Sequence, residues 1–310
     1  MRTAWVTRRA SLVAGGVALF ISVGACQQGS APGAGAAAGA GAEHANALYD
    51  EGLSWAKKAE TAPLPTPPPL AAPLPRGAEP PPAPEFKPEE IQAVSFFEKA
   101  IAAEPTDARP HLALALLLGP HALHRLELEE QAVWRKKPAR GKGRATPPPP
   151  VATPDPSGID YSVARIVRLY QAGIQNEPSR QPVEQLVTFA IQAKDLEAAE
   201  GGLQELVKRV KESPEPFLRY GDFMLNVKKD NDGAIEQYRQ ALIWRPDDEA
   251  TRAKVAGIYI DMGAEAYAQK QYAIAQTHFA NAVKYVTDKT SPQGVKVQDY
   301  LTRLREIRGR

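Results

Sequence analysis

Small and apolar residues recur along the chain at intervals of three, four and seven positions, which is the period of an amphipathic helix. The clearest run begins at Ala234 and continues with an aromatic residue four positions on, a small residue three further, an adjacent aliphatic residue and then a proline. The same spacing, with or without the proline, begins at Ala93, Ile166, Ala199 and Ala275. The pattern predicts a series of similar helices. A coiled coil is disfavoured, because no heptad is sustained and prolines end several of the periods.

The distances between these runs indicate a repeat of about 34 residues. Ile166 and Ala199 are 33 positions apart, and Ala199 and Ala234 are 35 apart. Ala275 follows Ala234 by 41 positions, which predicts a unit lengthened by about two helical turns. The interval from Ala93 to Ile166 is 73 positions, or two periods plus an insertion.

A second helical pattern precedes these runs, so each repeat is predicted to be a pair of helices. The first-helix positions are His111, Leu114, Ala115 and Leu118; Val183, Leu186, Val187 and Ala190; and Phe217, Tyr220, Gly221 and Met224. Small residues such as Ala234 and Ala241 would let two antiparallel helices approach closely. We expect Tyr238 and Phe279 to fill the gap between neighbouring pairs. The proline ends the second helix, because the residue before a proline is excluded from the α region.

This arrangement resembles the tetratricopeptide repeat (TPR), a helix-turn-helix unit of 34 residues. The resemblance covers residues 44–288 and implies an all-α, TPR-like α-solenoid within a domain at 44–310. A last amphipathic helix at 293–308, with Val297, Tyr300, Leu301, Leu304 and Ile307 on its apolar face, would cap the final repeat. The expected units are 44–105, 108–178, 180–213, 214–246 and 247–288.

Two proline-rich insertions interrupt the first two units, at about 61–88 and 127–157. Many of the 29 prolines of the chain lie in them, and such segments favour extended conformations that cannot form a core. We expect both insertions to be disordered. The second contains a basic run, Arg135–Arg144, followed by four consecutive prolines.

The N-terminus has the organisation of an export signal. Arg2, Arg8 and Arg9 precede an apolar stretch at 10–25 that ends in Val-Gly-Ala, and Cys26 follows. This tetrad resembles the lipobox of bacterial lipoproteins. The resemblance implies that residues 1–25 are removed by cleavage between Ala25 and Cys26, and that Cys26 is acylated. A Gly/Ala-rich tether at 26–43 would then separate the membrane from the repeats.

Other interpretations of this segment are weaker. The apolar stretch is shorter than the roughly 20 residues of a transmembrane helix, and an ordinary cleaved signal would leave the single cysteine free in an oxidising compartment. Residues 7–12 also resemble a twin-arginine export signal, although an ordinary basic leader explains them as well. Gln27 follows the cysteine where lipoproteins retained in the inner membrane typically have aspartate. This favours the outer membrane, facing the periplasm.

Charge and cysteine content argue against a nucleic-acid-binding domain and against a domain stabilised by disulfides. Without the three leader arginines, 35 basic and 36 acidic residues remain, and this balance argues against a nucleic-acid-binding domain. With one cysteine, no intramolecular disulfide can form. Stability must therefore come from packing.

No catalytic or metal-binding motif emerges. The segment 230–233 suggests a calcium loop, but Lys228 and Arg239 stand where oxygen ligands are needed, so it is interpreted as a turn with Gly233 in the tight connection. His121 and His124 lie three apart, but Pro120 is expected to disrupt the helix there. We therefore predict a protein that is not an enzyme and has no cofactor.

The remaining candidate site is the groove that stacked first helices line in such arrays, the usual site for an extended peptide or helix. Helix phase places Arg219, Asp222, Asn226, Arg252 and Tyr259 there. The expected function is a membrane-anchored periplasmic scaffold that binds envelope proteins, with pilus or outer-membrane assembly as examples from the resemblance. An alternative is an envelope lipoprotein that binds polymer or lipopolysaccharide through the basic loop at 135–157.

Overall fold

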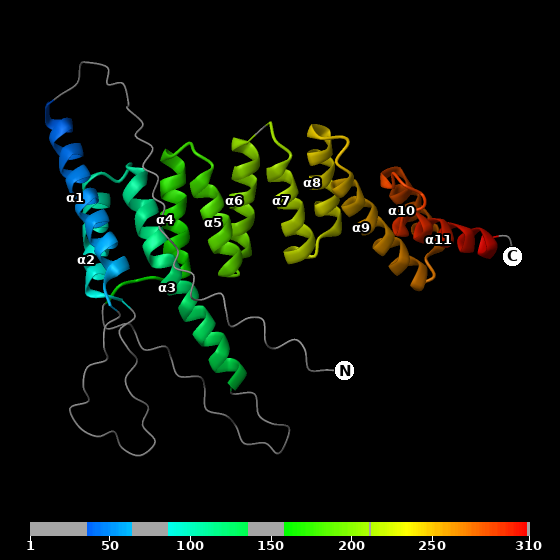
Figure 1. The fold of residues 1–310 in the computed structure, drawn as a ribbon, viewed down its shortest axis with the longest axis horizontal. Helices are drawn as coiled ribbons and strands as arrows, with labels where there is room; N and C mark the ends of the chain where they lie inside the picture. Colours follow the sequence, from blue (N-terminus) through cyan, green and yellow to red (C-terminus); the bar gives the residue numbers. More distant parts are fainter. Residues whose placement is uncertain (1–35, 64–85, 136–157, 211, 309–310) are drawn as a thin grey trace, which may run out of the picture. The chain divides into compact units, whose positions relative to one another are not determined.

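The structure is a computed structural model that describes residues 36–63, 86–135, 158–210 and 212–308 (Figure 1). The described residues from Ala40 onward belong to one compact unit, Ala40–Arg310. All regular secondary structure in the described ranges is helical. The elements are α1 (Ala36–Thr61), α2 (Pro88–Ala103), α3 (Ala108–Arg135), α4 (Val163–Asn176), α5 (Gln181–Gln192), α6 (Leu196–Arg209), α7 (Glu215–Phe223), η1 (Met224–Lys228), α8 (Asn231–Trp244), α9 (Glu249–Ala268), α10 (Tyr272–Tyr285) and α11 (Pro292–Arg308).

The helices pack as successive pairs, α1 with α2 through to α9 with α10, and α11 follows the fifth pair (Figure 1). The predicted all-α, TPR-like solenoid of five units and a capping helix is confirmed. The small positions of the repeat lie at the closest helix contacts, and Ala199, Ala234 and Ala275 are each fully buried. One continuous core runs from Tyr49 to Ile258, and a second core joins α9, α10 and α11.

Three pairs interlock through a glycine and an aromatic ring. A Cβ atom added to Gly221 would lie 2.7 Å from the ring of Tyr238, and one added to Gly263 would lie 2.8 Å from the ring of Phe279. Gly52 faces Phe97 in the same way. Each ring therefore packs between the two helices of its own pair, and not only between neighbouring pairs as expected. Phe279 also contacts the following helix, since its ring stacks on Tyr300 of α11.

The prolines end the second helices as predicted. Glu104, Glu177 and Arg245 each precede a proline and have φ values of −141°, −115° and −138°, outside the α region. The next unit begins a few residues later in all three cases, so the proline fixes where one unit ends and another starts.

The irregular periods have structural causes. Phe217 and Ala234 are 17 positions apart, whereas the equivalent residues Val183 and Ala199 are 16 apart. The extra residue is accommodated in η1, a single π-helical turn. The interval of 41 positions after Ala234 reflects α9, which has 20 residues where α5 has 12. The predicted lengthening by about two turns is thus located in a first helix.

Two helices are longer than the sequence suggests. α1 begins at Ala36, inside the expected tether, and α3 continues to Arg135, so residues 127–135 of the expected insertion are helical. Pro120 lies within α3 and does not interrupt it. Gly119 precedes it and has no Cβ, which removes one of the clashes that a proline ring makes with the preceding residue. Residues 64–85 and 136–157 lie outside the described residues, so the predicted disorder there stays a prediction.

Three turns between paired helices contain a lysine in the left-handed region. Lys194, Lys229 and Lys270 have φ values of 60°, 60° and 62°. The tight connection before α8 therefore depends on Lys229 and not on Gly233. Gly233 instead belongs to the first turn of α8, where its N–H donates to the capping carboxylate of Asp230 at 2.9 Å.

We expect Lys229→Gly to raise the free energy of unfolding by about 0.5–1 kcal/mol, because glycine adopts positive φ without the clash that a Cβ causes. Chemical denaturation of the two proteins measures the difference. Lys228→Gly, inside η1, is the control and should be destabilising. A neutral or destabilising Lys229→Gly would contradict the assigned backbone.

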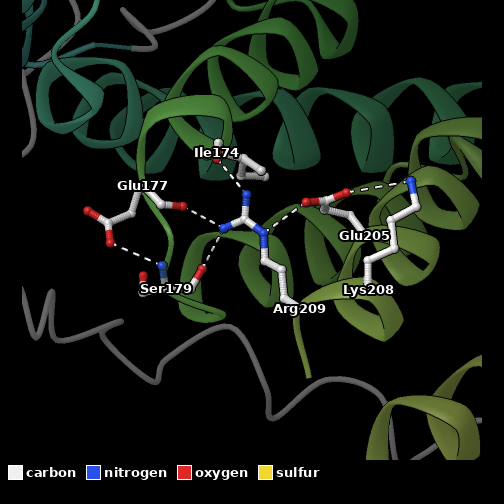
Figure 2. A network of polar contacts seen from close by, with 6 residues as sticks. All are labelled: Ile174, Glu177, Ser179, Glu205, Lys208 and Arg209. Carbon is white, nitrogen blue, oxygen red and sulfur yellow. Dashed lines mark hydrogen bonds and ion pairs between the residues drawn. The ribbon is translucent and has the colours of Figure 1, made fainter. Parts of the chain in front are cut away.

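Arg209 joins the second helices of two successive repeats (Figure 2). From the end of α6 its guanidinium donates to the carbonyls of Ile174 (2.6 Å), Ser179 (2.9 Å) and Glu177, at the C-terminus of α4 and just beyond it. Its Nε donates to Glu205 at 2.9 Å. The last carbonyls of a helix have no partners within the helix and attract cations, so Arg209 caps α4 from the next repeat.

The capping helix closes the second core as predicted. Val297 and Leu304 are buried, and the ring of Tyr300 stacks on Phe279 with centroids 4.6 Å apart. Ile307 is 37% exposed, so the apolar face ends before it.

Candidate partner-binding face

Three of the five predicted groove residues lie on one helix and its extension. Arg219 and Asp222 are on α7 and are half-buried, and Asn226 is exposed on η1. Arg219 approaches Glu184 of α5 at 3.4 Å, and Asp222 accepts hydrogen bonds from Lys254 of α9 and from the Tyr238 hydroxyl, both at 2.6 Å. These side chains therefore extend toward the neighbouring first helices.

The other two predicted residues face α10 and the loop before α9. The guanidinium of Arg252 donates to the Pro246 carbonyl at 3.2 Å and lies 3.5 Å from the Lys284 carbonyl. The ring of Tyr259 lies between those of His278 and Tyr285, with centroids 6.3 and 6.1 Å away. The structure thus does not bring Arg252 and Tyr259 together with Asp222, and their part in a groove stays a prediction.

Opposite charges bridge the successive first helices α5, α7 and α9, and α9 to the capping helix α11. The pairs are Glu184–Arg219 (3.4 Å), Asp222–Lys254 (2.6 Å) and Asp261–Lys296 (3.6 Å). We call these six residues and Asn226 the first-helix face. A half-exposed ion pair contributes at most about 1 kcal/mol, so these groups can exchange their partners for those of a bound chain at little cost.

Sequence reasoning missed four members of this face: Glu184, Lys254, Asp261 and Lys296. A signal for them exists, because the members of each pair lie about one repeat apart, at 35, 32 and 35 positions. Residues one period apart occupy equivalent places on adjacent first helices, so opposite charges at that separation predict a bridge.

The Tyr238 hydroxyl connects this face to the core. Burial, followed by the hydrogen bond to Asp222 and its negative charge, raises the pKa of Tyr238. The ring rests on Gly221. Asp222 therefore has a structural role in addition to its place on the first-helix face.

This raised pKa predicts alkaline destabilisation. The unfolded chain releases the tyrosine proton near pH 10, while the folded protein retains it. The contribution of Tyr238 is therefore complete below about pH 10 and is lost as the pH rises toward the folded pKa. Denaturation at pH 8, 10 and 11 should show a shallower alkaline loss for Tyr238→Phe than for the wild type. Tyr272→Phe is the control, and equal slopes in the wild type and Tyr238→Phe would contradict the prediction.

A cavity of about 480 Å³ lies elsewhere, between α3 and the segment 158–163. Arg125 is at its wall, where it pairs with Glu129 at 3.2 Å and donates to the Tyr161 hydroxyl at 3.2 Å. Asp160 and Ser162 also line this cavity, together with apolar residues such as Ala122, Leu126 and Ile159.

The residues considered as metal ligands in the sequence make other contacts. His121 lies 3.4 Å from Glu90 and packs against Phe86, and Asp230 is the N-cap of α8. Among the residues that the structure describes, no three or more His, Cys, Asp or Glu side chains are grouped so as to hold a metal ion.

The predicted membrane signals lie beyond the described residues. Ala25, Cys26 and most of the basic run after Arg135 are outside them, so cleavage, acylation and polymer binding stay predictions. Within the described ranges, none of the helices has the length and apolar character needed to span a membrane.

No protein-family model and no curated protein matches the chain. Among solved structures it is similar to PilF of Pseudomonas aeruginosa, with 14% identity, 86% of this chain and 93% of that chain covered, and a TM-score of 0.32. It is also similar to MamA, with 12% identity, coverage of 79% and 97%, and a TM-score of 0.37. A third similarity is to IFIT1 with a capped RNA, with 15% identity, coverage of 71% and 44%, and a TM-score of 0.37. These similarities are distant, and the TPR-like fold assignment rests on the helix pairs of this chain.

Proposed function

We propose that this protein is a scaffold that binds another protein along the first-helix face and catalyses no reaction. The observation that carries the proposal is the row of partly exposed charges on the first helices α5, α7 and α9 and on α11, bridged at 3.4, 2.6 and 3.6 Å. A row of alternating charges suits an extended chain, because each bridge can be replaced by a contact with the ligand. The exposed amide of Asn226 adds a donor and an acceptor for a peptide backbone.

A photo-crosslinking amino acid at Asn226, introduced into the full chain in intact cells, tests this proposal. The matched control carries the same group at Gln276, which is exposed on α10. We expect a discrete protein adduct from position 226 that is absent from position 276. Lys254→Glu combined with Arg219→Glu should abolish that adduct, because the cations of two of the three bridges are reversed. Equal labelling at the two positions would reject the first-helix face.

We further propose that Cys26 is acylated and holds the scaffold at the outer membrane, facing the periplasm, where its partners would be envelope proteins. The support is the sequence alone: the basic leader, the apolar stretch and the tetrad that ends in Cys26. Assembly of pili or of an outer-membrane complex is one such role.

Replacing the cysteine tests the anchor. Lipid chains contribute about 0.8 kcal/mol for each buried CH₂, so two or three chains make membrane attachment effectively permanent. We expect Cys26→Ser to leave the helical circular dichroism unchanged and to move the protein to the soluble fraction. Retention of the variant in carbonate-washed membranes would refute the anchor without affecting the first-helix face.

A further inference from the structure

The end of α8 exposes two large apolar side chains next to each other. Ile243 is 67% exposed and Trp244 is 48% exposed. The same two positions in the other second helices, counted from the small residue of the repeat, are Ala102-Ala103, Gln175-Asn176, Lys208-Arg209 and Lys284-Tyr285. The repeat therefore does not require apolar residues here, and the pair is peculiar to the fourth unit.

Charges of opposite sign follow this pair within a few residues. Arg245 comes next, and Asp247 and Glu249 lie beyond Pro246. All three are exposed, and within the described ranges their side chains form no ion pair. Asp248, between them, is occupied as the N-cap of α9, where it accepts hydrogen bonds from Ala250 and Thr251.

This surface has an apolar centre with a cation next to it and two anions further along. Two copies related by a two-fold axis would therefore place apolar residues against apolar residues and each cation against the anions of the other copy. In a two-fold interface every contact occurs twice, so Arg245 of one protomer can meet Asp247 or Glu249 of the other in both directions. Tryptophan and arginine are the residues most enriched among the energetically dominant contacts of interfaces.

We propose that this corner, defined as Ile243, Trp244, Arg245, Asp247 and Glu249, is the interface through which two copies of the chain associate. Its small apolar area predicts a weak dimer, since interfaces below about 1,200 Å² are typical of transient complexes. Dimerisation would place two first-helix faces in one assembly and raise the avidity for a partner with repeated binding segments. The dimer does not depend on the function proposed for that face.

Sedimentation equilibrium of the full chain carrying Cys26→Ser tests the dimer. This substitution removes both a lipid and a disulfide as causes of association. We expect a reversible monomer–dimer equilibrium with a Kd in the micromolar range, and a weakening of more than about tenfold in Ile243→Ser/Trp244→Ala. Val283→Ser, at a residue that is 44% exposed on α10, is the control and should leave the Kd unchanged. A wild type that stays monomeric, or one that associates equally well without the apolar pair, would overturn the proposal.

Charge reversal tests the two-fold geometry. Arg245→Glu and Asp247→Arg/Glu249→Arg should each fail to self-associate, because like charges then face each other. Mixed together, the two variants should form a heterodimer, because each supplies the charge that the other requires. Failure of the mixture to associate, with both variants folded by circular dichroism, would rule out the pairing.

Discussion

Phe279→Ala is expected to lower the free energy of unfolding by about 3–5 kcal/mol, the range for truncating a fully buried phenylalanine. The ring is completely buried, rests on Gly263 and stacks on Tyr300. Its removal therefore leaves a cavity between α9 and α10 and also removes the surface on which α11 is seated. Chemical denaturation followed by circular dichroism measures the loss, and hydrogen exchange should show the largest increase in α11.

The control is Phe96→Ala, because Phe96 is only partly buried and its ring does not pack against a glycine of the partner helix. Gly263→Val tests the same contact from the other helix, since its Cβ would lie 2.8 Å from the ring. The losses in free energy of unfolding are not additive for residues in contact. The double variant Gly263→Ala/Phe279→Leu should therefore lose less stability than the sum of the two single variants. A loss for Phe279→Ala no larger than that for Phe96→Ala would show that the interlock is unimportant.

The helix pairs could be predicted because they depend on local spacing. Ala234, Tyr238 and Ala241 share one helix face, and a proline at a fixed distance ends the helix. These rules use only residue type and separation along the chain. The same reasoning located the extra residues before Ala275 in a helix, and the structure places them in α9.

The candidate site was less predictable because side-chain direction depends on the neighbouring helices. Asp222 and Arg252 both fit a first-helix phase, yet one bridges to Lys254 and the other turns to the Pro246 carbonyl. Helix phase does not specify such choices. Lys229 is similar: a lysine gives no sequence signal for a left-handed turn, and the hydrogen bonds of the two adjoining helices impose that conformation.

Arg209→Ala is expected to lower the free energy of unfolding by about 2–4 kcal/mol. Hydrogen bonds to charged groups contribute about 1.5–3 kcal/mol, and the removal of Arg209 leaves the carbonyls of Ile174 and Ser179 without this donor. The guanidinium side chain is only 17% exposed, so water replaces it poorly. Sequence pattern gives no indication of the contacts that reach beyond α6, because these are made to backbone carbonyls (Figure 2).

Lys208→Ala is the matched control, because Lys208 adjoins Arg209, is 72% exposed and makes only a 3.8 Å ion pair with Glu205. It should change the free energy of unfolding by less than about 0.5 kcal/mol. Arg209→Lys should recover only part of the loss, since an ammonium group cannot reproduce the planar fork that reaches several carbonyls at once. If Arg209→Ala and Lys208→Ala unfold at the same denaturant concentration, Arg209 does not hold the two repeats together. A specific loss would instead mean that the junction between the second and third repeats depends on one side chain, since α6 has no terminal proline to fix where its unit ends.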